Sequence, residues 1–180
     1  MRFLGRWLGN SFSTALALVL GILAMQAPAF TRDYATALLQ VATDARRDVD
    51  QREASARQFY GIDASGDDAL IAALQPHEPS NAESLTRSLD RLRQLRQAYD
   101  DIAGQPALLQ PVIALGGAID DRGGYRQAIW QISLSRYNLQ LELSLAAVVY
   151  GFGGVLLGSL IGQLMLLPFR DRAARHGLAR

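Results

Sequence analysis

Two long uncharged stretches constrain the fold of this chain more than any other feature of its sequence. Residues 7–31 and 143–169, which are 25 and 27 residues long, contain no Asp, Glu, Lys or Arg and are rich in apolar side chains. A hydrocarbon layer about 30 Å thick is crossed by roughly 20 apolar residues in an α-helix. We therefore predict two transmembrane helices, one at residues 11–31 and one at 143–169.

The arginines beside these stretches predict the orientation of the chain. Five of them are expected to act as topology anchors: Arg2, Arg6, Arg170, Arg172 and Arg175. Positive residues in short flanking segments stay on the cytoplasmic side of a membrane. Both termini are therefore expected in the cytoplasm, as residues 1–10 and as a basic tail at 170–180. Residues 32–142 are expected on the opposite side of the membrane.

The first stretch also admits a second interpretation. Its basic start, its apolar run and the Ala-Pro-Ala sequence at 27–29 resemble a signal peptide that is cleaved after Ala29. Cleavage of residues 1–29 would leave the intervening domain anchored by the second helix alone. We favour a retained helix, because the uncharged stretch is longer than a signal peptide requires and because Trp7 suits the membrane–water interface.

The distribution of charge argues against nucleic-acid binding, and the type of basic residue indicates a bacterial origin for the chain. Residues 32–142 hold twelve Arg and sixteen Asp or Glu, so this segment is acidic although the whole chain carries +1. A nucleic-acid-binding domain concentrates cations on its folded part, so no nucleic-acid partner is expected. All eighteen basic residues are Arg, which we interpret as the composition of a GC-rich bacterial genome. The chain is therefore expected to be a multi-pass protein of the bacterial inner membrane with a periplasmic domain.

The residues between the two stretches have a helical pattern. Apolar residues recur every three or four positions, most clearly from Leu85 to Ile102, as on one face of an α-helix. Five helices are expected: from the first span to about residue 58, from Ser65 to Leu74, from Ser80 to about 103, at 107–119, and from Arg126 without a break into the second span. Ser65 and Ser80, each followed three residues later by an acid, are expected to cap two of them. The predicted fold is an all-α membrane protein in which two transmembrane helices flank an extracytoplasmic antiparallel helical bundle.

Small residues in both spans predict close helix packing. They recur at intervals of three or four: Ala17 and Gly21 in the first span, and Gly151, Gly154, Gly158 and Gly162 in the second. Glycines at such spacing form a groove that lets a second helix backbone approach closely in lipid. The simpler interpretation is packing of the two spans against each other. The alternative is self-association or docking of another membrane protein, and a pore is disfavoured because both spans are uncharged.

No catalytic, cofactor or metal site is predicted. The sequence has no serine nucleophile elbow, no phosphate-binding loop and no H-E-x-x-H motif, and it has no cysteine. Three pairs of adjacent aspartates are interpreted as solvated helix ends, because neighbouring side chains on a helix point in different directions. His77 and His176 are expected on opposite sides of the membrane, where they cannot share a metal. We therefore expect neither an enzyme nor a small-molecule substrate.

Two segments of the chain resemble a known family. Residues 26–30 (Gln-Ala-Pro-Ala-Phe) followed by Tyr34 and Leu38, and residues 137–143 leading into VVYGFGGVLLG, are similar to the first and last parts of a family of short bacterial inner-membrane proteins. That family is designated only as a domain of unknown function. The resemblance covers nearly the whole chain and implies two spans with a helical region between them. It implies no catalytic or binding residues.

The preferred functional hypothesis is a non-enzymatic accessory or scaffold protein. Its glycine-lined span and its outer bundle would pack, within the lipid bilayer, onto a larger membrane complex or onto a second copy. The layout is also similar to the sensor regions of bacterial chemoreceptors, which makes a periplasmic ligand-sensing module the alternative. Because only eleven residues follow Phe169, such a sensor is expected to signal through a partner chain. A small oligomeric channel is the least favoured hypothesis.

Overall fold

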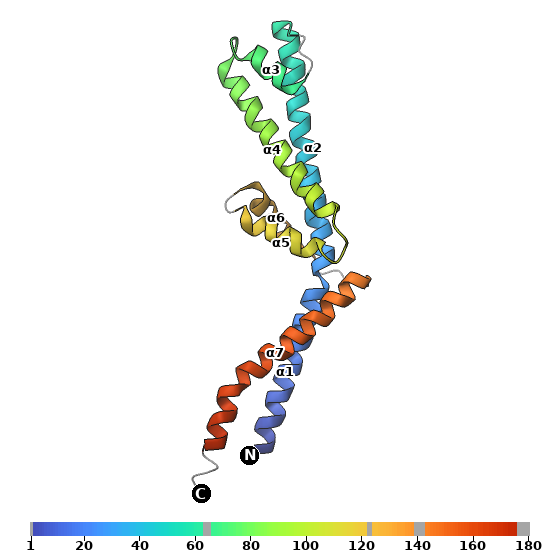
Figure 1. Cartoon of the computed structure of the whole chain (residues 1–180), viewed down its shortest axis with the longest axis vertical. Coiled ribbons are helices and arrows are strands. Elements are labelled where there is room, and N and C mark those ends of the chain that lie inside the picture. Colours follow the sequence, from blue (N-terminus) through green and yellow to red (C-terminus); the bar gives the residue numbers. More distant parts are fainter. Residues whose placement is uncertain (1, 63–65, 122–123, 139–142, 176–180) are drawn as a thin grey trace. The chain divides into compact units, whose positions relative to one another are not determined.

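The computed structural model describes residues 2–62, 66–121, 124–138 and 143–175, and every element of regular structure in these segments is an α-helix. Seven helices follow one another (Figure 1): α1 (Arg2–Met25), α2 (Ala27–Tyr60), α3 (Asp67–Leu74), α4 (Pro79–Ala103), α5 (Gln110–Asp120), α6 (Tyr125–Arg136) and α7 (Leu145–Arg175). The prediction of an all-α protein is confirmed. The chain forms two compact units, of which the first contains Met1–Phe30 with Asn138–Arg180 and the second contains Thr31–Tyr137.

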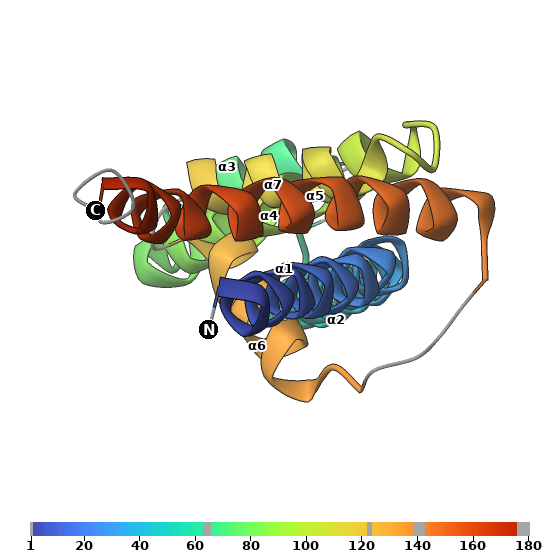
Figure 2. The same ribbon diagram turned by 90° about the horizontal axis from the view of Figure 1, so that it is seen from below.

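In the first unit, α1 and α7 pack side by side (Figures 1 and 2). Among the described residues, two helical segments are long and apolar enough to cross a membrane: Gly9–Tyr60 contains an 18-residue window with a mean hydropathy of 1.7, and Leu145–Leu166 contains one with a mean hydropathy of 1.9. Side chains that point away from the pair are large and apolar, and Leu18, Phe152 and Leu156 are each more than half exposed. A contiguous surface of this kind is unfavourable in water.

The first helix is interrupted at Gln26, where α1 gives way to α2. Pro28 has no backbone N–H and therefore cannot continue the helical hydrogen-bond ladder. At the junction the Gln26 N–H binds the Leu23 carbonyl at 3.1 Å, which is one residue closer in sequence than the bond of a regular α-helix, and the Phe30 N–H binds the Gln26 carbonyl at 2.9 Å with the regular α-helical spacing. The helix predicted to leave the first span is thus divided by a proline, and it extends to Tyr60, slightly beyond the expected end.

In the second unit, α4 runs antiparallel to α2 (Figure 1). Arg52 of α2 donates a hydrogen bond to the Ser84 hydroxyl at 2.9 Å, whereas Tyr34 at the start of α2 lines the same pocket as Ile102 at the end of α4. Each helix carries a stripe of buried apolar residues: Leu38, Ala42, Val49 and Ala56 on α2, and Ala82, Leu85, Leu89, Leu92 and Leu95 on α4. Removal of these leucines from water is the main force that stabilises this unit.

The short helix α3 is tied to both long helices by ion pairs. Asp67 lies 3.5 Å from the guanidinium of Arg46 on α2, and Asp68 lies 3.3 Å from that of Arg93 on α4. Two leucines of α3 are buried beneath these contacts. At the other end of the unit, α5 and α6 pack against α4 and against each other, and the guanidinium of Arg91 lies 4.4 Å above the Tyr125 ring, close enough for a cation–π interaction.

The predicted serine caps are wrong for α4 and are not found at α3. Glu78 holds the N-cap position of α4, Pro79 is its first residue, and no side chain caps it. Proline at the first position has a preset helical φ angle and lacks the N–H that a cap would bind, so the helix starts without the Ser80 box. At α3 the N-cap position belongs to Gly66, again without a side-chain cap, and Ser65 lies outside the described residues.

The prediction of one unbroken helix from the outer domain into the second span is also wrong. α6 ends at Arg136, and Tyr137 adopts an extended conformation with φ −66° and ψ 124°. A new helix then begins with a cap, because the Ser144 hydroxyl accepts a hydrogen bond from the Ala147 N–H at 3.1 Å. The apolar residues around Ser144 concealed this helix start in the sequence.

Candidate functional site

The small residues of both spans lie between α1 and α7 in a contact termed here the glycine seam. It is formed by Ala17 and Gly21 of α1 and by Gly151, Gly154, Gly158 and Gly162 of α7. A Cβ atom added to Gly158 would lie 2.6 Å from the Cα of Ala17, and one added to Gly21 would lie 2.6 Å from Cγ2 of Val155. Non-bonded carbon atoms are normally separated by about 3.5 to 4 Å, so neither position has room for a side chain.

The seam continues along α7 in both directions. A Cβ atom on Gly162 would lie 2.6 Å from Oγ of Ser13, and one on Gly154 would collide with the Leu20 carbonyl oxygen. Gly153 faces away from the seam, and a Cβ atom there would meet nothing within 4 Å. In this structure α1 therefore fills the groove, which is one of the two arrangements that the glycine pattern allows. A partner helix could enter the groove only if α1 left it.

The arginines expected to anchor the topology lie in the first turns of α1 and in the last turns of α7. Arg2 and Arg6 belong to α1, and Arg170, Arg172 and Arg175 belong to α7. Their side chains lie outside the described residues. Trp7, whose side chain is described, is 59% exposed.

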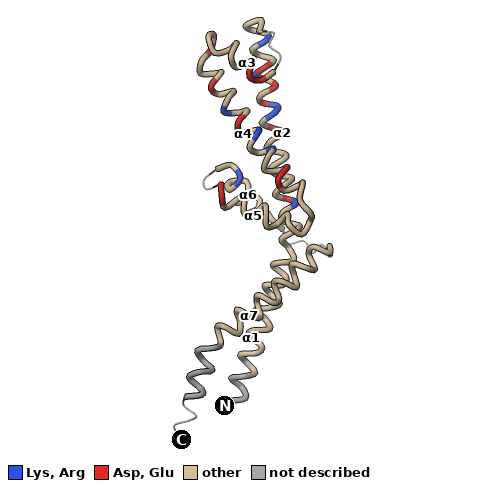
Figure 3. Tube along the Cα trace, viewed as in Figure 1, with Lys and Arg blue, Asp and Glu red and all other residues tan. Residues whose placement is uncertain are grey.

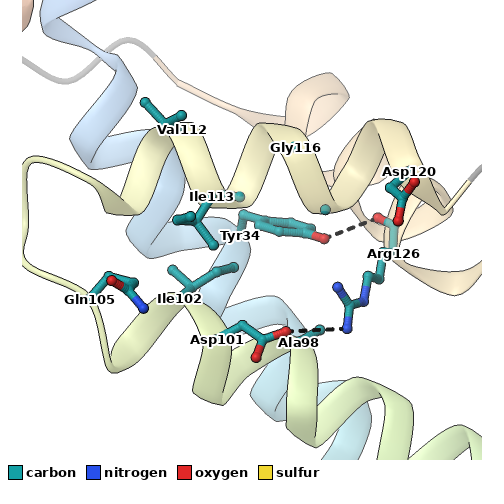
Figure 4. Close-up of a pocket in the computed structure, with 12 residues that line it drawn as sticks. Tyr34, Ala98, Asp101, Ile102, Gln105, Val112, Ile113, Gly116, Asp120 and Arg126 are labelled. Atoms are coloured by element: carbon teal, nitrogen blue, oxygen red, sulfur yellow. Dashed lines mark hydrogen bonds and ion pairs between the residues drawn. The ribbon is translucent and has the colours of Figure 1, made fainter.

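The second unit contains a pocket that the sequence did not predict. The pocket has a volume of about 520 Å³ and lies between the end of α4, the side of α5 and the starts of α2 and α6 (Figure 4). Its apolar wall includes Ile102, Ile113 and Ala114. Polar side chains enter from four helices: Tyr34, Asp101, Gln105, Asp120 and Arg126. The pocket is partly open to solvent and combines these polar groups with the apolar wall.

Tyr34 forms the inner wall of the pocket. Its side chain is only 1% exposed, its hydroxyl donates a hydrogen bond to the Arg126 carbonyl at 3.3 Å, and its ring meets that of Trp130 edge to face at 5.1 Å. Burial raises the pKa of Tyr34 to about 12, an effect that the charge of Arg126 opposes and the charge of Asp121 strengthens. The hydroxyl therefore remains a neutral donor at physiological pH.

Arg126 places a positive charge at the mouth of the pocket. Its backbone N–H binds the Asp121 carboxylate at 2.7 Å near the start of α6, and its guanidinium lies 3.5 Å from the Asp101 carboxylate on α4. A Cβ atom added to Gly117 would lie 3.2 Å from this guanidinium. A larger residue at position 117 would therefore crowd the Arg126 side chain. Because the Arg126 and Asp101 side chains are 26% and 46% exposed, water screens their attraction.

The charged side chains of the pocket lining are Asp101, Asp120 and Arg126. Within the described residues, no group of three His, Cys, Asp or Glu side chains is placed to hold a metal ion. The two carboxylates and one guanidinium favour a ligand that can form hydrogen bonds and that carries no net negative charge.

Four of the six paired aspartates contact other residues of this unit. Asp67 and Asp68 bind arginines of the two long helices, Asp101 binds Arg126, and Asp121 holds the start of α6. His77 stacks on the Tyr60 ring at 5.3 Å, and His176 lies outside the described residues. Sequence spacing could not reveal the pocket, because its polar residues are brought together from distant parts of the chain and no local motif links them.

The fold and the two sites define a class of protein: a helical protein with two helices long and apolar enough to cross a membrane, and with a separate helical unit between them in the sequence. The chain belongs to the family described as "Protein of unknown function (DUF2937)", which matches residues 8–175. The predicted resemblance to a family of unknown function is thereby confirmed. No curated protein and no solved structure matches the chain.

Proposed function

We propose that this protein is a non-enzymatic accessory or scaffold protein of the bacterial inner membrane. In this proposal α1 and α7 cross the bilayer, both termini face the cytoplasm, and the unit formed by residues 31–137 lies in the periplasm. The protein docks onto a larger membrane complex or onto a second copy of itself. The two-helix anchor places the outer unit close to its partner.

The observation that carries the proposal is the packing of the glycine seam. The small residues of α1 and α7 face each other, whereas Leu18, Phe152 and Leu156 point outward. This is the arrangement of a helix pair in lipid, where close backbone contact replaces the hydrophobic drive that water provides. Because α1 already fills the groove, the surfaces that remain for a partner are the outward faces of the two spans and the outer unit.

The proposal is tested by cross-linking the protein in native membranes without overexpression, followed by affinity purification. We expect a reproducible membrane-protein partner or a cross-linked dimer. Recovery of the protein as an uncross-linked monomer, with only lipid present, would contradict a scaffold role. N-terminal sequencing of the same sample distinguishes a retained first helix from a chain that begins after Ala29.

The orientation is tested separately with reporter fusions. A reporter that is active only in the cytoplasm is expected to be active when it is fused after Arg180. The same reporter is expected to be inactive when it is inserted at residues 63–65, between α2 and α3. The reverse pattern would exclude the proposed topology without affecting the scaffold role.

The pocket favours a second candidate function, a periplasmic sensor that binds a small molecule and signals through a partner chain. Its lining of carboxylates, a guanidinium and apolar side chains suits a small neutral or cationic molecule with an apolar portion. Purified protein in detergent is expected to gain thermal stability with members of a panel of amines and amino-acid derivatives. Gly116 lines the pocket, and a Cβ atom there meets nothing within 4 Å, so Gly116→Leu should abolish the gain without disturbing the fold. Equal shifts in wild type and variant would exclude the pocket as the binding site.

A further inference from the structure

We infer that the outer face of α5 rests in the interface of the lipid bilayer and holds the outer unit against the membrane surface. The inference rests on the proposed function, because it requires α1 and α7 to cross a bilayer. It concerns a surface outside the glycine seam, and Val112 is the one residue that this surface shares with the pocket lining. That surface, termed here the α5 stripe, consists of Leu108, Val112, Leu115 and Ile119.

The α5 stripe is a continuous apolar face. Val112, Leu115 and Ile119 recur at intervals of three and four along α5, and Leu108 lies in the turn that precedes the helix. Their exposed fractions are 42% for Leu108, 58% for Val112, 47% for Leu115 and 54% for Ile119. Isolated exposed leucines are common on protein surfaces, but a row of them along one helix usually marks a site of contact.

The charge pattern separates this segment from the rest of the outer unit. Residues 103–119 contain no Asp, Glu, Lys or Arg. By contrast, α2 and α4 carry charged residues along much of their length (Figure 3). Two helices of this unit thus present a surface suited to water, whereas α5 presents a surface suited to an apolar medium.

The packing of α5 leads to the same conclusion. Its buried residues are Pro111, Ala114 and Ala118, of which the two alanines are 1% and 4% exposed, whereas Leu115 and Ile119 are 47% and 54% exposed. On α4, by contrast, large residues are buried, since Leu89 and Leu95 are 2% and 0% exposed. A helix that buries its small residues and exposes its large ones is unfavourable in water and favourable when its outer face contacts lipid.

The short stretch of chain between the first span and the pocket explains why lipid is the expected occupant of the α5 stripe. Val112 and Gly116 line the same pocket as Tyr34, and Tyr34 is only three residues beyond position 31, where the first span is predicted to end. An extended chain covers at most about 3.6 Å per residue, so no more than about 11 Å separates Tyr34 from the end of that span. The polar headgroup layer on each side of a bilayer is about 5 to 7 Å thick. The pocket wall that α5 provides is therefore within reach of this layer.

The charges near the α5 stripe indicate whether its contact with lipid is apolar or electrostatic. Asp120 ends α5, Asp121 follows it, and α5 itself contains no Lys or Arg. Interfacial helices that depend on anionic lipids carry basic residues on their polar face. Contact through the α5 stripe is therefore apolar, and it should be equally strong on a neutral bilayer and on an anionic one.

The inference is tested with single-cysteine variants, which the absence of native cysteine makes straightforward. Val112→Cys, Leu115→Cys and Ile119→Cys are each labelled with an environment-sensitive fluorophore and reconstituted as single copies in phosphatidylcholine nanodiscs. Leu156→Cys on the outward face of α7 is the reference for lipid contact. Gln97→Cys, at an exposed position of α4, is the matched control for water. Lipids with a nitroxide near the headgroup serve as the quencher, and circular dichroism confirms that every variant keeps its helix content.

We expect the three stripe labels to be quenched by the nitroxide lipid about as strongly as a label near the end of a span, with no quenching at position 97. Quenching at position 156 without quenching at any stripe position would overturn the inference and leave the membrane anchor intact. Absence of quenching at position 156 would instead contradict the proposed function. Stripe labels that are shielded from water only when discs contain two copies would show that a second copy of the chain, and not lipid, covers α5.

Discussion

The glycine seam and the α2–α4 contact are both long helix pairs, but they are built from opposite kinds of side chain. The seam joins positions such as Gly158 and Ala17, where a single added Cβ atom would collide with backbone. Along the α2–α4 pair, α4 instead buries large leucines such as Leu89, which is only 2% exposed. In water, large apolar side chains gain most when they are buried, whereas in lipid they gain nothing, and close backbone contact becomes decisive. Under the proposed topology, α1 and α7 are therefore packed for lipid and the α2–α4 pair is packed for water.

The largest expected effect comes from adding bulk to the glycine seam. Gly158→Leu should destabilise the α1–α7 pair by about 3 kcal/mol or more, since the obstacle is the backbone of Ala17, which cannot turn aside. Gly153→Leu is the matched control on the same helix, because a Cβ atom there meets nothing within 4 Å. The free energy of unfolding, measured by denaturation in mixed micelles, is the readout. Equal losses in the two variants would mean that α1 does not occupy the groove.

A leucine-to-alanine substitution is expected to have different effects on α4 and on α7. Leu89→Ala should lower the free energy of unfolding of the outer unit by about 2.5 kcal/mol, because it leaves a cavity in a buried stripe. Leu156→Ala, at a position that is 63% exposed on α7, should change stability by less than about 0.5 kcal/mol, as is usual for surface positions. Both values come from the same denaturation experiment. A large loss for Leu156→Ala would show that this face of α7 packs against protein.

Tyr34 provides a smaller effect with a defined dependence on pH. Tyr34→Phe should cost about 1 kcal/mol through loss of its buried hydrogen bond. Burial raises the pKa of this hydroxyl from its ordinary value of 10.0 to about 12, so the folded chain keeps a proton that the unfolded chain releases. This contribution to stability is complete below pH 10 and is lost as the pH rises through 12. Thermal melts across this range should show a steeper decline for wild type than for Tyr34→Phe, and parallel curves would contradict the buried position of the hydroxyl.

The smallest effect is expected at the charged surface of α3. The Asp68 and Arg93 side chains are 87% and 58% exposed, and exposed ion pairs contribute little. Asp68→Asn should therefore change the free energy of unfolding by less than about 0.5 kcal/mol, and added salt should remove the difference. A salt-independent loss above this value would indicate a role for Asp68 beyond the ion pair with Arg93.

The sequence was sufficient to predict the elements whose cause is local. The Leu85–Ile102 pattern predicted α4, and the end expected near residue 103 agrees with its last residue, Ala103, whereas the helix expected at 107–119 starts later, at Gln110. The spacing of the small residues identified the face of α7 that packs closely. These features depend on periodicity or on backbone restrictions, which neighbouring residues alone determine.

Features that depend on distant contacts could not be predicted in this way. The pocket requires Tyr34, Asp101 and Arg126 to meet from three helices, and no spacing rule connects them. The end of α6 at Arg136 was missed because its apolar residues continue in a helical pattern into the second span, where Ser144 then starts a new helix. The exposure of the large side chains of α5 could not be predicted either, because exposure depends on how the helix packs and not on its composition.

The claim on which the comparison depends is that lipid surrounds α1 and α7, and it is tested most directly by extraction of native membranes with alkaline carbonate. This treatment releases peripheral proteins and leaves proteins with membrane-spanning helices in the bilayer. We predict that the full chain stays entirely in the membrane pellet, as an integral membrane protein of the same preparation does. Release of the chain into the supernatant would contradict the claim, because the exposed leucines of α7 would then have to be covered by protein rather than by lipid.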